Sequence, residues 1–238
     1  MTINSMPIDK KDSWRMFNMI SEHYDLLNQL LSFGIDRHWR RVLVKYLSLS
    51  DRKNILDLAT GTGDILLTIL KNEKRIIEAV GIDLAANMMA IGLAKIDKSG
   101  LSQQIRLLRG DAAHIPFDAA HFENVTIAFG IRNMNDPIVV LREMNRVLTP
   151  KGRGIILEFS LPANKFLRAL HLFYLRMIVP LIGGLVSGHT EAYRYLNQTI
   201  ETFSYGEPFC RLMQEAGFTR STAHPLMGGI ATIYVGEK

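Results

Sequence analysis

Short apolar runs alternate along the chain with segments in which apolar residues recur at helical spacing. The apolar runs predict strands, and the periodic segments between them predict helices. The predicted strands cover residues 54–59, 76–83, 105–109, 122–129 and 154–159, and the later helices cover residues 86–97 and 136–148. This alternation predicts an α/β fold with a mostly parallel, doubly wound sheet.

The two ends of the chain extend this pattern. Residues 13–47 predict two helices that are separated at Ser32-Phe33-Gly34, with Asp36 as the N-cap of the second helix. Near the C-terminus, a helix over 209–216 precedes two strands over 221–226 and 231–236, which form a hairpin. The expected architecture is therefore one domain over residues 1–238. It has a seven-stranded sheet with an antiparallel strand near the C-terminus, and a helical cap over residues 1–50.

Residues 160–206 interrupt the alternation, and an insertion of this length usually has a function. Phe166–Val186 is long and apolar enough to suggest a membrane span. Arg168, His171, Arg176 and Pro180 argue against a span, because charged side chains are costly at the centre of a bilayer. We expect a helical lid over an apolar pocket, or an element that lies on a membrane surface.

The composition is that of a globular protein, with 47% apolar and 21% charged residues. The single cysteine, Cys210, excludes an internal disulfide or a cysteine-based metal cluster, and we expect no metal site. Residues 1–14 lack the apolar core of a secretory signal, which favours a cytoplasmic location. The net charge of +5 permits nucleic acid or an anionic membrane as a partner, but no run of like charge supports either one.

The segment Asp57–Asp64 joins the first predicted strand to a helix through a glycine-rich turn. It does not match the dinucleotide pattern G-x-G-x-x-G, because Leu66 occupies the third glycine position. Asp57-x-Ala59-x-Gly61-x-Gly63, which also contains Thr62, resembles motif I of class I S-adenosylmethionine methyltransferases. We therefore expect Asp57, Gly61, Thr62 and Gly63 to bind S-adenosylmethionine; the alternative is an ordinary strand-to-helix turn.

Further candidates for this cofactor stand at the ends of the other predicted strands, where an open α/β sheet forms its crevice. The carboxylate of Asp83 can accept hydrogen bonds from both ribose hydroxyls, although it could instead be a helix N-cap. Met88 can pack on the adenine, Asp111 and Ala112 lie where the adenine edge needs polar contacts, and Ala128 would lie beside the sulfonium.

Several motifs between about residue 14 and the C-terminus give a more specific resemblance: Tyr24-Asp25-Leu26-Leu27-Asn28, Ala128-Phe129-Gly130-Ile131-Arg132-Asn133, Leu157-Glu158-Phe159-Ser160 and Tyr193-Arg194-Tyr195-Leu196. These segments resemble the ubiquinone/menaquinone biosynthesis C-methyltransferase family. The resemblance implies a class I methyltransferase fold, and C-methylation of a polyprenylated quinol ring, as in demethylmenaquinol to menaquinol. The family's cofactor positions correspond to Thr62, Asp83, Asp111–Ala112 and Ala128. Thr60, Asp111, Ala128 and His189 depart from residues that the family often has.

Methylation of a quinol carbon requires a proton acceptor and a group that stabilises the developing phenolate. We expect Arg132 to stabilise the phenolate and Asn133 to orient a ring oxygen. The alternative for Arg132 is a structural salt bridge to Asp136 or Glu143.

Three further polar residues are candidates for the substrate pocket, namely Tyr193, His189 and Tyr24. For His189 and Tyr193, an ordinary position on the surface of the lid is an equally good interpretation.

Two other functions remain open at this point. A nucleic-acid methyltransferase should show an Asn/Asp-Pro-Pro-Phe/Tyr motif after the fourth strand or a catalytic cysteine, whereas this chain has Phe129-Gly130-Ile131 there and its cysteine is elsewhere. A non-catalytic subunit with the same fold would not need acidic residues at its strand ends. We expect a membrane-borne polyprenyl quinol as substrate, transient contact with the inner face of a membrane and no nucleic acid, with a homodimer left open.

Overall fold

The computed structural model describes residues 10–48 and 53–238 and is built around one seven-stranded sheet. The strand order is β3-β2-β1-β4-β5-β7-β6. The first five strands pair in parallel, and β7 runs antiparallel to both β5 and β6. This confirms the predicted sheet and its antiparallel C-terminal strand. The strands are β1 (Lys53–Leu58), β2 (Ile76–Asp83), β3 (Ile105–Arg109), β4 (Phe122–Ala128), β5 (Leu148–Phe159), β6 (Arg220–Leu226) and β7 (Ala231–Glu237).

Alternate residues of each strand point to opposite faces of the sheet. Because apolar residues occupy both faces, helices cover both. In β1, Ile55 packs into a core with α2, α3 and α4, whereas Leu56 and Leu58 pack into a core with α5 and α9. The helices of these layers are α2 (Ile35–Val44), α3 (Asp64–Asn72), α4 (Ala86–Lys98), α5 (Pro137–Val147) and α9 (Glu207–Glu215).

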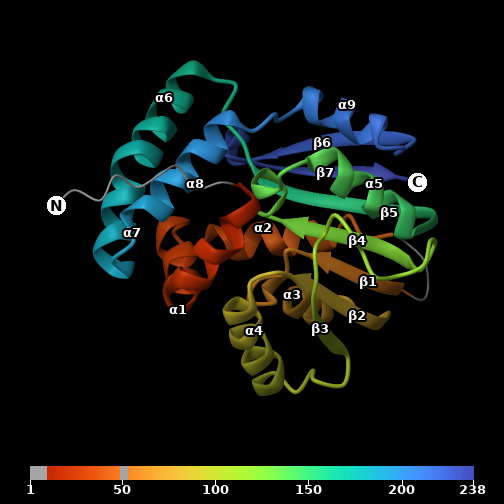
Figure 1. Ribbon diagram of the computed structural model, residues 1–238. Coiled ribbons are helices and arrows are strands. Elements are labelled where there is room, and N and C mark those ends of the chain that lie inside the picture. Colours follow the sequence, from red (N-terminus) through yellow and green to blue (C-terminus); the bar gives the residue numbers. More distant parts are fainter. Residues whose placement is uncertain (1–9, 49–52) are drawn as a thin grey trace.

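A third hydrophobic core lies outside these layers and joins the N-terminal helix to the insertion. Met16, Ile20 and Leu27 of α1 pack with Leu175 and Val179 of the insertion. Figure 1 shows α1, α6, α7 and α8 grouped at one side of the sheet. The elements that complete the described chain are η1 (Lys10–Asp12), α1 (Ser13–Leu31), η2 (Ile131–Asn133), α6 (Lys165–Phe173), the π-helical turn η3 (Tyr174–Ile178), α7 (Val179–Ser187), α8 (Thr190–Thr202) and η4 (Met227–Gly229).

Two local predictions were wrong. Asp36 is not an N-cap: Gly34, with φ of 72°, precedes the first residue of α2, and Asp36 lies inside the helix with its carboxylate paired to Arg40. The fifth strand does not begin at residue 154, because β5 follows α5 directly at Leu148. The sequence Pro150-Lys151-Gly152 lies within the strand, where Lys151 has a positive φ of 67°.

Candidate active site

The carboxylate of Asp57 supports the turn after β1 through hydrogen bonds. Its carboxylate is 1% exposed and accepts hydrogen bonds from the hydroxyls of Thr60 (2.7 Å) and Thr126 (2.6 Å). Gly61 and Gly63 have φ values of 55° and 75°, which glycine adopts readily. Asp57 was expected to bind the cofactor; the structure places its carboxylate on the two threonines below the turn, where it supports the shape of the loop.

The carboxylate of Asp83 joins the same turn to the end of β2. Its Oδ2 accepts the Gly61 N–H at 2.7 Å, and its Oδ1 accepts the Ala85 N–H at 2.7 Å. Burial raises the pKa of Asp83, although both backbone hydrogen bonds oppose this shift. Met88 packs close to the turn, since a Cβ on Gly61 would lie 3.3 Å from Met88 Cε.

A cavity of about 560 Å³ opens at this place, and we call it the strand-end cavity. It is lined by most of the residues that the sequence predicted as cofactor ligands: Gly61, Asp83, Met88, Asp111, Ala112 and Ala128. Thr62 and Gly63 do not line it. The Thr62 hydroxyl donates to Asp25 at 2.7 Å and accepts from Lys95 Nζ at 3.0 Å, and Gly63 is the residue before α3.

The other wall of the strand-end cavity comes from the N-terminal segment, of which only Tyr24 was predicted from the sequence, as a candidate for the substrate pocket. Its residues there are Lys10, Lys11, Ser13, Trp14, Phe17 and Tyr24. The guanidinium of Arg109, at the end of β3, lies 5.9 Å from the centre of the Trp14 ring. Aromatic residues at positions 14, 17 and 24 were the available signal, but their spacing also suits an ordinary buried helix face.

A second cavity of about 520 Å³, which we call the apolar cavity, adjoins the first. It lies between α1, α2, the ends of β4 and β5, and the helices of the insertion. We call these helices (α6, η3, α7 and α8) the lid. Most residues that line the cavity are apolar. Tyr24 and Phe129 line both cavities, so these two side chains stand at the boundary between them. A ligand in one cavity can therefore meet a ligand in the other beside the end of β4.

Arg132 lies in the wall of the apolar cavity and is 2% exposed. Its Nη1 donates to Glu158 Oε1 at 2.6 Å and to the Phe129 carbonyl at 2.6 Å. Arg132 thus forms a salt bridge, but its partner is neither Asp136 nor Glu143. Its Nε is buried and has no hydrogen-bond partner among the described residues. The buried Nε leaves Arg132 with a donor for a ligand in this cavity.

Asn133 faces the strand-end cavity instead. Its Nδ2 donates to the Phe129 carbonyl at 3.4 Å, and its Oδ1 is buried without a partner among the described residues. A buried acceptor without a partner is unfavourable, so this atom suits a donor on a bound ligand. The structure places Arg132 and Asn133 on either side of the boundary between the two cavities.

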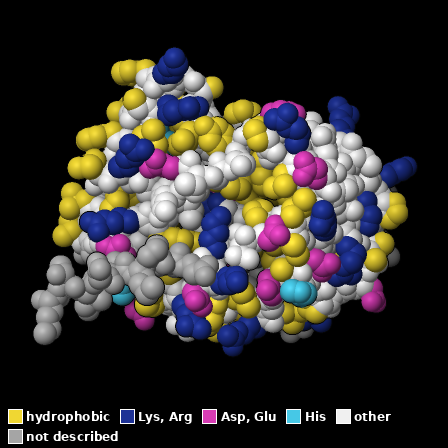
Figure 2. Space-filling model, turned by 45° about the horizontal axis from the view of Figure 1, so that its top comes forward, with side chains coloured by type: hydrophobic (Ala, Val, Ile, Leu, Met, Phe, Trp, Pro, Cys, Tyr) yellow, Lys and Arg dark blue, Asp and Glu magenta, His cyan; other side chains and the backbone are white. Residues whose placement is uncertain are grey.

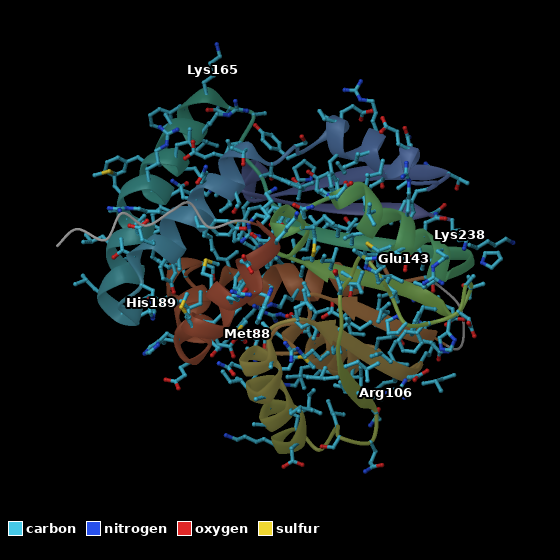
Figure 3. All side chains as sticks on the ribbon, in the orientation of Figure 1. Met88, Arg106, Glu143, Lys165, His189 and Lys238 are labelled. Atoms are coloured by element: carbon cyan, nitrogen blue, oxygen red, sulfur yellow. The ribbon has the colours of Figure 1, made fainter. Side chains whose placement is uncertain are left out.

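Of the two lid residues that were candidates for the substrate pocket, one lies in the apolar cavity and the other does not. Tyr193 is 4% exposed and lines the apolar cavity, and burial raises the pKa of its hydroxyl. His189 is exposed at the start of α8 and lines neither cavity. Figure 3 shows it at the outer end of the lid, apart from Met88. The structure thus places His189 outside both cavities, in agreement with the alternative of an ordinary position on the surface of the lid, because the turn after α7 directs it outward.

His171 is a pocket residue that the sequence analysis did not select. It lines the apolar cavity, and its buried Nε2 has no partner among the described residues. Burial lowers the pKa of its ring, which keeps the imidazole neutral and able to accept a hydrogen bond. The only signal in the sequence was a histidine within an apolar helix.

Two solved structures show the class of fold to which this protein belongs. A possible histamine N-methyltransferase from Thermotoga maritima, described as S-adenosylmethionine-dependent, matches with a TM-score of 0.66 and 17% identity over 95% of this chain and 99% of its own. The [4+2]-cyclase SpnF matches with a TM-score of 0.64 and 14% identity over 97% of each chain. At such low identity these matches show only the fold. The fold is therefore that of the class I S-adenosylmethionine-dependent methyltransferases.

The family is more specific than the fold. The chain belongs to the ubiE/COQ5 methyltransferase family, whose model matches residues 6–238. A relative from Geotalea uraniireducens, named "Ubiquinone/menaquinone biosynthesis C-methyltransferase UbiE", is 44% identical over 94% of both chains. A "Demethylmenaquinone methyltransferase" from Thermus thermophilus is 43% identical over 94% of this chain and all of its own. The protein is thus an S-adenosylmethionine-dependent C-methyltransferase of this family.

The residues of the strand-end cavity fit this cofactor. Asp83 presents a carboxylate for ribose hydroxyls, Met88 and Ala112 provide apolar surface for adenine, and the free Oδ1 of Asn133 can accept from the amino group of the methionine part. When bound, S-adenosylmethionine supplies a methyl group that its sulfonium has already activated.

The first prediction concerns Asp83. Asp83→Ala should weaken S-adenosylhomocysteine binding about ten- to a hundredfold, because charge-assisted bonds to the ribose and the support of Gly61 are both lost. Calorimetry measures this, with Asp97→Ala on α4 as an exposed control. Affinity should also fall as the pH is lowered through the raised pKa of Asp83, since protonation removes an acceptor. A folded variant with unchanged affinity would exclude Asp83 as the ribose ligand.

A second prediction concerns the close contact of the turns after β1 and β4. A Cβ on Gly130 would lie 2.7 Å from Ala59 Cβ, so Gly130→Ala should destabilise the fold by about 1–3 kcal/mol. Ala59 has a positive φ of 49°, which glycine tolerates well. Adding Ala59→Gly should therefore recover most of the lost stability in urea denaturation. A double variant no more stable than Gly130→Ala would contradict this explanation.

Proposed function

We propose that this protein transfers the methyl group of S-adenosylmethionine to a ring carbon of a prenylated quinol of the demethylmenaquinol type. The observation that carries the proposal is the boundary formed by Tyr24 and Phe129, where a cavity suited to the cofactor meets an apolar cavity of similar size. The names of the relatives support the same substrate class.

The residues around the apolar cavity suit the chemistry of a quinol. A ring carbon becomes nucleophilic when the neighbouring hydroxyl gives up its proton, and the negative charge then lies on the ring oxygen and that carbon. As the carbon bonds to the methyl group, the bond from the methyl to sulfur breaks, and the ring loses one proton overall. Arg132 can stabilise the oxyanion through its free Nε, and the neutral ring of His171 can accept a hydrogen bond from the second hydroxyl.

The test is radiolabelled methyl transfer to reduced naphthoquinols, reduced benzoquinols and tRNA. We expect transfer to a reduced quinol, none to the oxidised quinone because its ring is electron-poor, and none to tRNA. Transfer to tRNA alone would favour the nucleic-acid alternative. Cofactor binding without transfer to any quinol would contradict the proposal and favour a non-catalytic role.

We also propose that the enzyme meets its substrate at the inner face of the cytoplasmic membrane. Residues Lys165–Ser187 form one 23-residue helix that is long and apolar enough to cross a membrane by length and composition, with 22% of its most apolar window buried. The helix presents a continuous row of exposed apolar side chains, which Figure 2 shows along the outer edge of the molecule. They are Phe166, Leu167, Leu170, Phe173, Met177, Leu181 and Leu185.

The mouth of the apolar cavity opens within this exposed apolar surface. Phe33, Leu167, Leu170, Phe173 and Met227 are all exposed, and all line the cavity as well. A polyprenyl tail could thus pass from a bilayer into the cavity without crossing water, which matters because each CH₂ group gains about 0.8 kcal/mol on burial. This continuity supports a helix that lies on the bilayer rather than one that crosses it.

Basic side chains lie beside this apolar surface, but one of them, Arg176, is already paired with an acidic residue. Arg168 uses its Nε to reach the Pro162 carbonyl, and the labelled Lys165 points outward at the start of α6 (Figure 3). Arg176 lies on the same helix but forms a two-point salt bridge with Glu201, with its Nε 2.9 Å from Glu201 Oε1. Its charge is therefore already compensated, and Lys165 and Arg168 are the better candidates.

Flotation with vesicles of phosphatidylglycerol and phosphatidylethanolamine tests the membrane proposal. We expect binding that weakens with salt, and that is reduced by Leu181→Asp combined with Leu185→Asp, because these exposed residues lie outside the cavity. Leu93→Asp on α4 is the matched control, since Leu93 is 51% exposed on another surface. The lid variant should retain transfer to a short-tailed quinol but lose transfer to a long-tailed quinol in vesicles. Equal flotation of both variants would contradict this surface.

A further inference from the structure

Helix α1 contributes to the walls of both cavities along its length. Ser13, Trp14 and Phe17 in its first half line the strand-end cavity, whereas Asn28 and Leu31 at its end line the apolar cavity. Tyr24, between the two halves, lines both cavities. Because α1 is a single continuous helix of 19 residues, one element connects the walls of the two cavities.

The first half of α1 is hydrogen-bonded to the segments that surround the cofactor. The Asn18 side chain accepts the Asn87 N–H at 2.9 Å, and Asn87 directly precedes Met88 in the chain. Further along, Asp25 Oδ1 accepts from the Thr62 hydroxyl at 2.7 Å, and Asp25 Oδ2 accepts from Lys95 Nζ at 2.8 Å. Thr62 belongs to the cofactor turn, so Asp25 ties the middle of α1 directly to that turn.

The second half of α1 is attached to the lid. The Tyr174 hydroxyl donates to the Leu31 carbonyl at 2.7 Å, and the rings of Tyr174 and Phe33 lie 6.3 Å apart. Leu27 is completely buried in the core that α1 shares with the lid helices. The position of α1 therefore influences the shape of the apolar cavity as well.

We propose that α1 couples the two binding sites, with Asp25 as the positioning residue that transmits the coupling. A cofactor bound against Gly61 fixes the turn after β1, and the hydrogen bond from Thr62 to Asp25 passes this constraint to α1, which forms a wall of the apolar cavity. The quinol then binds more tightly to the enzyme–cofactor complex than to the free enzyme. Because coupling between two ligands is reciprocal, the quinol must tighten cofactor binding by the same factor. This inference rests on the proposed quinol site.

The central experiment measures this factor in the full chain. Calorimetry gives the affinity for S-adenosylhomocysteine and for a short-tailed naphthoquinol, each alone and in the presence of the other. For the wild type we expect each ligand to strengthen the other by about fivefold or more. In Asp25→Ala the factor should fall towards one, because the tie from α1 to Thr62 and Lys95 is lost.

Glu22→Ala is the matched control, because Glu22 is an exposed acidic residue on the same helix. This variant should keep the full coupling factor, and Asp25→Asn should keep part of it, since its amide oxygen can still accept from Thr62. A loss of general stability alone would weaken both ligands without removing their mutual effect. Independent binding in the wild type, or full coupling in Asp25→Ala, would overturn the proposal.

Hydrogen exchange of the wild type gives a test that needs neither the variant nor a quinol. S-Adenosylhomocysteine alone should protect the amides of residues 25–31, which lie in the half of α1 beside the apolar cavity. Absence of this protection would overturn the coupling even if Asp25→Ala did not fold. If protection is observed but no quinol binds in any state, the proposed substrate is wrong, whereas the effect of the cofactor on α1 stands.

Discussion

Arg132→Met should lower the free energy of unfolding by about 3–5 kcal/mol, because it leaves the Glu158 carboxylate buried without its cation. Glu158 is completely buried, and its ionic partner in the structure is Arg132, with Oε1 2.6 Å from Nη1. The loss of stability is measured by urea denaturation at neutral pH. An unchanged midpoint would show that the salt bridge makes no net contribution to the fold.

The pH dependence of this variant provides a further check. Burial already raises the pKa of Glu158 while Arg132 lowers it, so removing the arginine should raise the pKa more. A carboxyl that keeps its proton to higher pH in the folded state costs stability as the pH rises from the unfolded pKa to the raised folded pKa. The stability lost in Arg132→Met should therefore be small in acid and grow as the pH increases.

The double variant Arg132→Met with Glu158→Gln separates stability from catalysis. It contains no uncompensated buried charge, so it should recover most of the stability that Arg132→Met loses. Its kcat should nevertheless fall about a hundred- to a thousandfold, as expected when a donor to a developing oxyanion is removed. Affinity for S-adenosylhomocysteine should change little, since Arg132 lines the apolar cavity. A folded double variant with normal turnover would make Arg132 a structural residue.

The parts of the site that local sequence could predict are those at the ends of strands. Asp83, Asp111 and Ala128 were selected because each follows an apolar run, and the carboxyl ends of parallel strands meet at one edge of a sheet. The strand-end cavity indeed brings these residues together. Their identification required only the strand boundaries and the parallel arrangement, both of which follow from the periodicity of the chain.

The contacts that sequence could not predict depend on how distant segments pack. Glu158 lies 26 residues from Arg132 in the chain. The two side chains meet only because β5 pairs with β4, which places Glu158 beside Arg132. The same holds for α1, whose helical periodicity is clear although nothing local shows that it would cover the cofactor turn. The position of His189 outside both cavities could not be predicted for a related reason, because the direction of a side chain at the start of a helix depends on the preceding turn.

Asp57→Asn should flatten the pH dependence of stability between about pH 4 and 7. The pKa of Asp57 is raised from 3.8 to about 7, mainly by burial and in addition by the negative charge of nearby Asp83, while hydrogen bonds from Thr126 and Thr60 and the charge of Arg40 oppose the shift. The folded state thus retains a proton that the unfolded state releases near its lower pKa. By linkage, stability is highest below the unfolded pKa and is lost as the pH rises towards 7.

The size of this effect follows from the shift of the pKa. For a group that is 1% exposed, the shift corresponds to a loss on the order of 4 kcal/mol between acid and neutral pH. Asparagine keeps the size of the side chain and can still bond to Thr60 and Thr126, but it does not ionise. Urea denaturation from pH 4 to 8 should show the wild type losing stability relative to Asp57→Asn as the pH increases, whereas Asp97→Asn on the exposed face of α4 should follow the wild type. Parallel curves for the wild type and Asp57→Asn would mean that Asp57 is ionised in the folded protein and holds the turn as a carboxylate.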